Sequence, residues 1–375
     1  MIVKDVIIIG AGAAGSSAAF HLANANKSVI ILEKEPTSFL KPCGGGMAAS
    51  VQEWFPFDLK PVIEEVINTV EFTWCLSDKV VAELPGSSPF WIVRREKLDQ
   101  LIIQNAIKLG AELIQPFEVA EINKENDYWL VFSQDKQCIK GKSVIIADGS
   151  KSPWPKHFGL GPRKLHYAST ISVRLKGKGL LKKGTSRFEF GLVKNGFAWA
   201  FPLENYINVG VGTFLGKGSI NSQKILEKLL PNLGFQSTEG IRKTSSLRVW
   251  NGHSSLNSDG ILVIGDAASL CDPFLAEGLR PALMSGKEAA FSLNLWLEGK
   301  NNTLDSYTNT MKIKWGESMA WGRRISQVFY RFPKIGYQLG IKRRTAPERI
   351  AQILSGKMSY GDIAQRVIKR LLFSR

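Results

Sequence analysis

The chain has few of the residues that build metal centres and disulfide frameworks. It contains four cysteines and four histidines in 375 residues, and no two of the cysteines show a C-x-x-C spacing: Cys43, Cys75, Cys138 and Cys271. Scattered cysteines without neighbouring histidines argue against a zinc site and against a disulfide framework. We therefore expect no bound metal and a reducing, cytoplasmic environment.

Long uncharged hydrophobic runs are also missing. No apolar stretch approaches the length of about 18 residues that indicates a membrane-spanning helix, and the chain begins with an apolar strand rather than a cleavable signal. Acidic residues are scarce relative to basic ones, which gives a net charge of +16, while the hydrophobic content is 44%. This composition excludes global disorder and allows a large core in one or two interleaved domains.

The positive charge is concentrated towards the C-terminus. Residues 312–375 contain 15 basic and 3 acidic side chains, a net charge of +12, interleaved with aromatic residues. This pattern favours peripheral contact with an anionic membrane surface or with anionic substrate groups, and a solvated basic helix face is the alternative. The spacing of Ile363, Val367 and Leu371 predicts an amphipathic helix that docks on the core or on a membrane. Nucleic acid is not expected, because no helix-turn-helix, RNP or zinc-finger pattern occurs.

A glycine-rich motif follows the first predicted strand. Gly10-Ala-Gly12-Ala-Ala-Gly15 joins an apolar strand to a helix of small residues, and Glu33 ends a second apolar strand over residues 29–32. The glycines allow a tight turn, close approach of a pyrophosphate and tight helix packing, and the acidic residue accepts a ribose hydroxyl. The motif predicts a dinucleotide site and leaves NAD and FAD both open.

Two later apolar strands end in aspartate. A run of Ile-Leu-Val-Ile-Gly leads into Asp266, and a helix is predicted after Gly278; a second run leads into Asp148-Gly149. Open α/β sheets bind ligands at the carboxyl ends of their strands, so both carboxylates are candidates for ligand contact. A simple turn or helix cap is the alternative role for Asp148.

The middle of the chain reads as a β-sheet layer. Three aromatic residues alternate with alanine before a proline: Phe197, Trp199 and Phe201. Alternation places them on one face, as the wall of an apolar tunnel or as ordinary sheet core. Residues 206–211 are predicted to form the return strand of a hairpin. Gly210 and Gly212 would leave space there for a ligand or a backbone.

Taken in order, these motifs resemble those of FAD-dependent flavoproteins of the aromatic-hydroxylase type. The set comprises Gly10 to Gly15 with Glu33, Arg95-x-x-Leu-Asp99, Asp148-Gly149 and Gly265-Asp266-Ala-Ala. Two further segments are similar to the geranylgeranyl reductase family within that group. They are Lys41-Pro42-Cys43-Gly44-Gly45-Gly46 and the stretch Phe-x-Trp-x-Phe-Pro followed by Gly-x-Gly.

The resemblance implies an α/β fold with three parts. A Rossmann-type FAD-binding domain would comprise residues 1–67, 93–163 and 248–300. An inserted antiparallel β-sheet substrate domain would comprise 68–92 and 164–247, and a basic helical C-terminal region 301–375.

The resemblance also implies the site. Its expected FAD-binding residues are Gly10, Gly12, Ala14, Gly15, Glu33, Cys43, Gly44, Gly46, Arg95, Val119, Asp148, Gly149, Asp266, Gly278 and Leu279. Cys43, Trp199 and Phe201 are the expected residues of the catalytic centre, where the two aromatic rings orient substrate. For Cys43, inert packing against the flavin is an equally open interpretation. The stretch from Phe274 to Gly278 would face the flavin opposite the Cys43 loop, and the following helix would stabilise the reduced flavin.

The implied activity is reduction of isolated prenyl double bonds by hydride from reduced FAD. The prenyl chain would belong to a lipid, a chlorophyll precursor, a quinone or a diphosphate, and NADPH or ferredoxin, as redox partner, would supply the electrons. An unactivated alkene offers no charge to bind, so orientation and exclusion of water should matter most. The alternatives are a monooxygenase, a halogenase and a non-catalytic prenyl-lipid carrier. The halogenase stretch Trp-x-Trp-x-Ile-Pro differs from this chain at Phe197 and Phe201.

Overall fold

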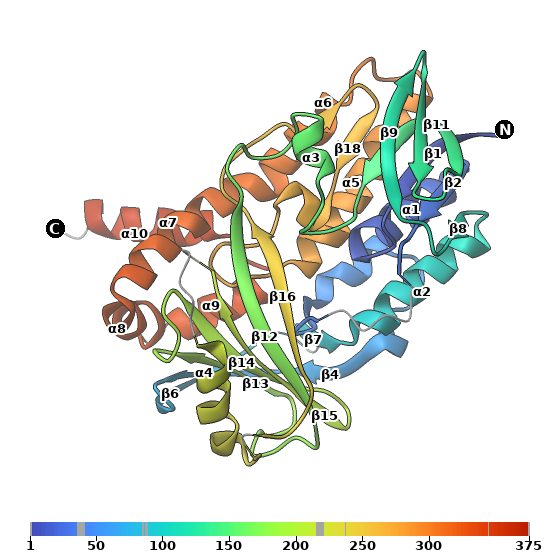
Figure 1. The fold of residues 1–375 in the computed structure, drawn as a ribbon. Helices are drawn as coiled ribbons and strands as arrows, with labels where there is room; N and C mark the ends of the chain where they lie inside the picture. Colours follow the sequence, from blue (N-terminus) through green and yellow to red (C-terminus); the bar gives the residue numbers. More distant parts are fainter. Residues whose placement is uncertain are drawn as a thin grey trace.

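The computed structural model describes residues 2–35, 42–84, 86, 89–214, 221–236, 238–343 and 345–373. Lys41 of the Cys43 loop lies outside this set, as do the side chains of Val367 and Leu371. Within the described residues the strands form three sheets, and helices follow at the C-terminal end of the chain (Figure 1). The described helices include none that is long and apolar enough to cross a bilayer.

The first sheet has the order β17-β18-β11-β1-β2-β8, in which β18 to β8 are parallel and β17 is antiparallel to β18. Strand β10 pairs antiparallel with β11, and β9 pairs with β10. Central strand β1 is an apolar run whose last four residues are buried, as expected for a strand covered on both faces. The bounds are β1 Val3–Ile9, β2 Val29–Leu32, β8 Glu112–Ile114, β9 Val119–Glu125, β10 Tyr128–Ser133, β11 Cys138–Ile146, β17 Asn257–Ser258 and β18 Ile261–Val263. Strands β1, β2, β11 and β18 occur where the sequence predicts apolar strands before the glycine motif, Glu33, Asp148 and Asp266.

Helices α1 (Ala13–Asn24) and α5 (Leu279–Leu297) lie against each other beside this sheet, and α2 (Arg95–Lys108) packs on α1. The small residues of α1 permit this close approach. Ser17 Oγ donates to the Leu283 carbonyl at 2.8 Å, and a Cβ on Gly286 would lie 2.4 Å from the Ala14 carbonyl oxygen. The short helix α3 (Trp154–His157) follows β11.

The second sheet has the order β16-β12-β15-β14-β13-β5-β6. All of its pairs are antiparallel except β13 with β5, which are parallel. Strands β5 and β6 come from an earlier part of the chain than the other strands of this sheet. The bounds are β5 Thr69–Trp74, β6 Ser77–Glu83, β12 His166–Lys176, β13 Thr185–Phe190, β14 Gly196–Pro202, β15 Tyr206–Thr213 and β16 Arg242–Val249. Helix α4 (Ser222–Leu229) packs on β15 and β12. The expected hairpin is therefore β14 with β15.

A small third sheet, β3-β7-β4, joins the chain after the Cys43 loop to the strand before α2. The bounds are β3 Gly46–Ala48, β4 Ile63–Ile67 and β7 Phe90–Val93, with 3-10 turns at Ala49–Trp54 and Lys60–Val62. Residues 90–92 thus pair here rather than in the second sheet. The domain division itself stays a proposal.

The C-terminal region is helical and lies along one end of the molecule (Figure 1). Its elements are α6 Asp305–Met311, η5 Lys312–Gly316, α7 Glu317–Arg331, α8 Pro333–Gly336, η6 Tyr337–Ile341, α9 Ala346–Leu354 and α10 Tyr360–Phe373. Several aromatic residues of the basic tail belong to the core: Trp315, Phe329, Tyr330 and Tyr337 are buried. These four aromatic side chains of the tail therefore pack into the protein core.

Candidate active site

The carboxyl ends of four parallel strands meet at one edge of the first sheet. The register aligns Ile9 with Leu32 and with Ile146, and Ile146 with Val263. The loops that follow these residues contain the glycine motif, Glu33, the Asp148 turn and Asp266. This convergence is the position at which open α/β sheets bind ligands.

The glycine motif forms a turn that only glycine can make. Gly10 has a φ of +102°, and a Cβ there would lie 2.6 Å from the Ala147 carbonyl oxygen; a Cβ on Gly15 would lie 1.9 Å from the Gly10 carbonyl oxygen. Glu33 Oε2 accepts from the Ala11 amide at 2.7 Å. Glu33, which is expected to accept a hydrogen bond from a ribose hydroxyl, therefore also stabilises the glycine turn.

Two carboxyl groups face the same space. Burial raises the pKa of Asp148 to about 6, and its Oδ1 has no hydrogen-bond partner among the described residues. Burial also raises the pKa of Asp266 to about 6, although the positive charges of Arg95 and Arg248 act to lower this pKa. The N-cap of the next helix after Asp148 is Pro153, so Asp148 is not a helix cap. A buried oxygen without a hydrogen-bond donor in the protein is expected at a site where a bound ligand donates that hydrogen bond.

Two arginines organise the surrounding loops. Arg95 donates to Asp99 at 3.2 and 3.0 Å; burial acts to lower its pKa, but Asp99 and Cys43 hold it above the ordinary value. Buried Arg248 donates to the Ala267 carbonyl at 3.2 Å and to the Ser152 carbonyl. Arg248 thereby links the Asp266 turn to the Asp148 turn, and the sequence analysis did not single it out.

A single cavity of about 780 Å³ connects these groups to the second sheet. Its walls include Gly10, Gly12, Ala14, Glu33, Cys43, Gly44, Gly46, Arg95, Val119, Asp148, Gly149, Asp266, Gly278, Leu279, Trp199 and Phe201. Of the expected site residues only Gly15 is missing from the wall, because it packs beneath the Gly10 turn. The structure thus brings the expected residues together, while their contacts with a cofactor stay predictions.

The Cys43 loop is held between β7 of the third sheet and β14 of the second sheet. Gly45 has a φ of +83°, and a Cβ there would lie 2.3 Å from the Val93 carbonyl oxygen. A Cβ on Gly44 would lie 3.0 Å from Phe201 Cε2, so the loop passes directly against this ring. Cys43 Sγ accepts from the Gly45 amide at 3.3 Å. The glycines are required by this packing.

Strand β14 forms the aromatic wall of the cavity, as its alternation predicts. Phe197, Trp199 and Phe201 line the cavity, while the intervening alanines face a separate core on the other side of the sheet. The space over Gly210 is filled by Trp199, since a Cβ there would lie 2.1 Å from Trp199 Cζ2. Gly212 similarly lies under the Phe214 ring. These glycines accommodate aromatic side chains rather than a ligand.

Asn208 joins the wall to the Cys43 loop. Trp199 Nε1 donates to Asn208 Oδ1 at 3.2 Å, and Asn208 Nδ2 donates to the Cys43 carbonyl at 2.9 Å. The side chain is almost fully buried. Sequence reasoning missed it, although an asparagine between Ile207 and Val209 in an apolar strand is a usable signal, because a buried amide requires partners.

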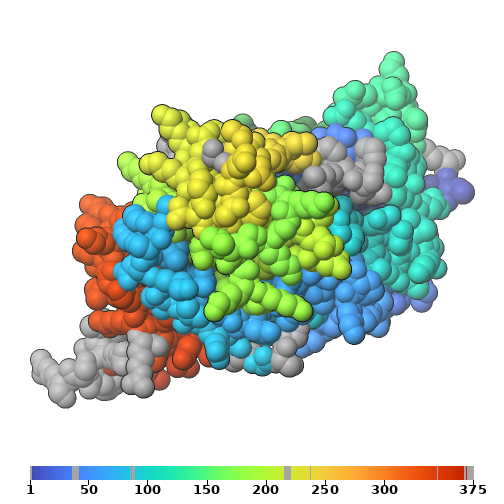
Figure 2. All heavy atoms as spheres, turned by 90° about the horizontal axis from the view of Figure 1, so that it is seen from below, coloured from blue at the N-terminus to red at the C-terminus, as the bar shows by residue number. Residues whose placement is uncertain are grey.

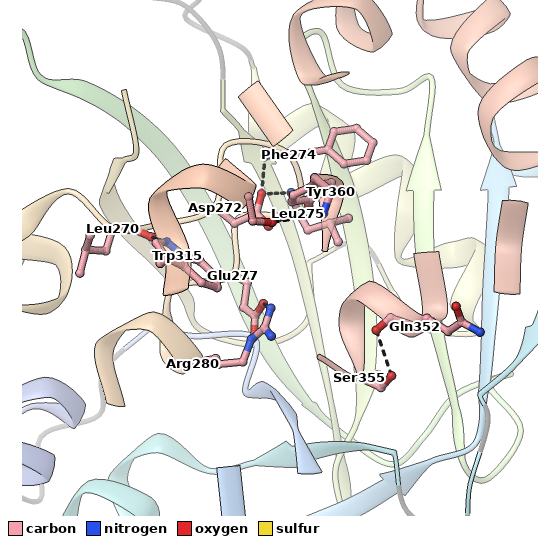
Figure 3. A network of polar contacts seen from close by, with 11 residues as sticks. Leu270, Asp272, Phe274, Leu275, Glu277, Arg280, Trp315, Gln352, Ser355 and Tyr360 are labelled. Atoms are coloured by element: carbon pink, nitrogen blue, oxygen red, sulfur yellow. Dashed lines mark hydrogen bonds and ion pairs between the residues drawn. The ribbon is translucent and has the colours of Figure 1, made fainter. Parts of the chain in front are cut away.

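The loop between β18 and α5 is fastened by the C-terminal helices. Trp315 Nε1 donates to the Leu270 carbonyl at 2.8 Å, and the Tyr360 hydroxyl donates to Asp272 Oδ2 at 2.7 Å (Figure 3). Asp272 Oδ1 accepts from the Phe274 and Leu275 amides at 2.6 and 3.0 Å. The C-terminal region thus shapes a loop that borders the cavity.

Residues 275–279 border the cavity, but Phe274 does not follow the expectation that it faces the cofactor. Its ring packs against Phe329, Tyr330 and Tyr360, at centroid distances of 5.2, 5.9 and 6.1 Å. Figure 3 shows Glu277 and Arg280 directed at each other below this cluster, and they form a two-pronged ion pair at 2.8 and 2.7 Å. The aromatic ring is drawn away because the C-terminal helices offer it an apolar site.

Tyr360→Phe tests this fastening. Removing the hydroxyl leaves Asp272 with one partner fewer in a buried site, so the free energy of unfolding should fall by about 1–3 kcal/mol. The change is measured by denaturant unfolding, with Tyr167→Phe as control because that side chain is exposed. Equal stability of the Tyr360 and Tyr167 variants would contradict a fastening role.

The pH dependence of the flavin-free protein tests the burial of Asp266. Because its folded-state pKa, about 6, is above the ordinary 3.8, the folded chain binds this proton more tightly than the unfolded chain. The stability cost therefore grows as the pH rises from about 4 to about 6 and is complete above that. Asp266→Asn should match the wild-type Tm near pH 4 and exceed it at about pH 7.5. Exposed Asp127→Asn is the control, and a pH-independent difference in Tm would oppose this assignment.

These observations fit a flavin dinucleotide. The cavity volume lies within the range of about 300–1,000 Å³ usual for small-molecule sites. The glycine turn before α1 provides backbone donors for phosphates, and Asp148 Oδ1 lacks a donor. Among the described residues, no cluster of histidine, cysteine or acidic side chains is arranged to hold a metal.

Comparison with known sequences supports this assignment. Residues 5–56 match the FAD binding domain family. A digeranylgeranylglycerophospholipid reductase of Methanocaldococcus jannaschii is 28% identical over 330 residues, which cover 83% of each chain. A second protein of that name, from Methanothermobacter thermautotrophicus, is 28% identical over 301 residues, 76% of each chain.

Known structures share the fold. A geranylgeranyl bacteriochlorophyll reductase-like protein from Thermoplasma acidophilum superposes with a TM-score of 0.80 at 19% identity, covering 96% of this chain and 93% of its own. A flavin-dependent brominase gives a TM-score of 0.74 at 17% identity and covers all of both chains. Fold and cavity together define an FAD-binding flavoprotein. The sequence relatives and the shared fold support an FAD-dependent oxidoreductase similar to the geranylgeranyl reductase family.

Proposed function

We propose that this protein saturates isolated carbon–carbon double bonds in the geranylgeranyl chain of a lipid, chlorophyll precursor, quinone or diphosphate. The main support is the single cavity that runs from the glycine turn to the aromatic wall of β14. The two sequence relatives named above are digeranylgeranylglycerophospholipid reductases. When bound and reduced, FAD supplies hydride to one carbon of the double bond, and a proton reaches the other.

The chain's own residues orient the substrate and exclude water. The Phe197, Trp199 and Phe201 rings provide a rigid apolar surface along which a prenyl chain lies extended. The Trp199–Asn208–Cys43 hydrogen bonds hold that surface at a constant position relative to the Cys43 loop. No histidine borders the cavity among the described residues. This suits a reaction in which positioning dominates over acid–base chemistry.

Anaerobic reoxidation tests the proposal. Photoreduced protein is mixed with geranylgeranyl lipids, quinones, chlorophyll precursors and geranylgeranyl diphosphate, and flavin absorbance is followed while products are examined by mass spectrometry. We expect reoxidation with at least one prenyl substrate and a product heavier by one hydrogen pair per reduced bond. Binding without reoxidation would identify a carrier instead.

The same protein is tested for oxygen chemistry. Oxygen consumption linked to hydroxylation of an aromatic substrate would establish a monooxygenase, and halide incorporation would establish a halogenase. Either result together with inert prenyl substrates would overturn the proposal. Reduction of the bound flavin by NADPH or by reduced ferredoxin, compared under argon, identifies the electron donor.

A further inference from the structure

An apolar stripe without a protein partner runs along the C-terminal helices. The exposed fractions of its side chains are 69% for Val328, 54% for Phe332, 57% for Ile335 and 55% for Leu339. The chain bends at Phe332, whose φ of −129° and ψ of 63° are not helical, so this residue is the junction between α7 and α8. Val328 lies on α7, Phe332 at the junction, Ile335 on α8 and Leu339 in the following turn η6, so exposed apolar side chains recur along the whole segment.

The opposite side of the same segment is already buried. Phe329, Tyr330, Tyr337 and Ile341 have exposed fractions of 7% or less. An ordinary surface helix is apolar on its buried side and polar on the other, whereas this segment also exposes four large apolar side chains. A contiguous exposed apolar surface of this kind marks an interaction site.

The surroundings of the stripe are basic. Residues 318–347 contain seven lysines or arginines and no acidic residue. Arg324, Arg331 and Lys334 are exposed, and no carboxylate among the described residues pairs with them. By contrast, Lys342 forms an ion pair with Asp78 at 2.5 Å. Unneutralised cations beside exposed apolar side chains are complementary to an anionic lipid surface.

Helix α7 and a chain of aromatic rings connect the stripe to the cavity wall. Phe329, on the inner side of α7, is 5.4 Å from Phe190 between ring centroids, and Phe190 is 5.7 Å from Phe197, which lines the cavity. Leu354 of α9 also lines the cavity. Figure 2 shows the C-terminal helices at one end of the molecule, beside the hairpin of β5 and β6. A helix with its side chains is about 10–12 Å across.

We propose that Val328, Phe332, Ile335 and Leu339, together with Arg324, Arg331 and Lys334, form a docking surface for an anionic bilayer. Apolar side chains on such a surface enter the lipid by about 5–10 Å. Docking there brings the end of the molecule that carries α7 and α9 against the membrane that holds prenyl chains, and Leu354 of α9 lines the cavity. The role of this surface in presenting substrate rests on the proposed function, whereas binding of the protein to a bilayer does not.

Vesicle flotation of the full-length holoprotein tests docking. The vesicles contain phosphatidylcholine with phosphatidylglycerol, or phosphatidylcholine alone. We expect binding that depends on phosphatidylglycerol and weakens with salt. Phe332→Ser with Ile335→Ser should lower the partition coefficient at least about tenfold. Arg331→Glu with Lys334→Glu should lower it by a similar factor, since each basic residue near the surface contributes about fivefold.

Leu180→Ser with Ile241→Ser is the matched control, because these side chains are 70% and 81% exposed and lie outside the docking surface. Circular dichroism and flavin content verify that all variants are folded. Unchanged flotation of the Phe332 and Ile335 variant would overturn the proposal. So would concentration-dependent dimerisation that this variant abolishes while wild-type protein ignores vesicles, because the surface would then bind a second copy.

Activity separates this inference from the proposed function. Docking variants should reduce turnover of geranylgeranyl lipid embedded in vesicles at least about fivefold and leave turnover of dissolved geranylgeranyl diphosphate unchanged. If no prenyl substrate reacts but vesicle binding depends on the named residues, the function fails and the docking surface stands. If prenyl substrates react and vesicle binding is absent, the docking surface fails alone.

Discussion

Gly15→Ala should deprive the protein of FAD. A Cβ at this position would lie 1.9 Å from the Gly10 carbonyl oxygen, which belongs to backbone and cannot rotate aside. Helix α1 would have to move away from the turn, and its amino-terminal amides would no longer face a bound pyrophosphate. We expect FAD affinity to fall by about 100-fold or more, equivalent to at least about 2.7 kcal/mol. Titration of the flavin-free protein with FAD measures this change.

Gly340→Ala is the matched control for this substitution. No described atom lies within 4 Å of a Cβ built there, and its φ is ordinary for a helix. This variant should retain wild-type flavin content. Normal FAD affinity in Gly15→Ala would contradict the placement of a pyrophosphate at the start of α1.

Trp199→Ala should remove most of the prenyl-reducing activity while FAD remains bound. The substitution deletes the central ring of the aromatic wall and its hydrogen bond to Asn208. A flexible prenyl chain would then lose its fixed position in the cavity. We expect kcat/KM for the prenyl substrate to fall about 10- to 100-fold, equivalent to about 1.4–2.7 kcal/mol. Steady-state assays with flavin content determined in parallel give the result.

Three related variants separate the causes. Trp199→Phe keeps a ring but loses the hydrogen bond, so an intermediate loss is expected. Asn208→Ala keeps the indole but releases the Cys43 carbonyl. In Gly210→Ala the new Cβ would lie 2.1 Å from Trp199 Cζ2 and force the indole towards the cavity. Full activity in all of them would exclude the wall from substrate positioning.

The local elements of the nucleotide-binding part could be predicted because their signals are local. Strand β2 occurs at the expected residues, and α5 begins directly after Gly278, as predicted. An apolar run bounded by glycine needs only its neighbours to be recognised as a strand. The glycine motif, Glu33 and the two aspartates each directly follow such an apolar run. Because parallel strands place their carboxyl ends together, these residues could be expected at one site.

Contacts between distant segments could not be predicted in this way. Asn208 meets Cys43 across 165 residues, and Tyr360 meets Asp272 across 88. Nothing in the sequence around Phe274 shows that its ring turns towards Phe329 and Tyr330. Such pairings depend on which apolar surfaces remain uncovered once the elements have packed.

By itself the sequence determined a dinucleotide-binding α/β fold and a strand, β14, whose aromatic residues alternate, while the resemblance to a known family implied FAD. Alternation and glycine spacing are properties of short segments and follow from backbone geometry. Only the tertiary structure decided that one cavity unites the glycine turn with that aromatic wall. It also separated the tail into buried rings such as Phe329 and an exposed stripe around Phe332. Burial is a property of the packed molecule, because it depends on partners far away in the chain.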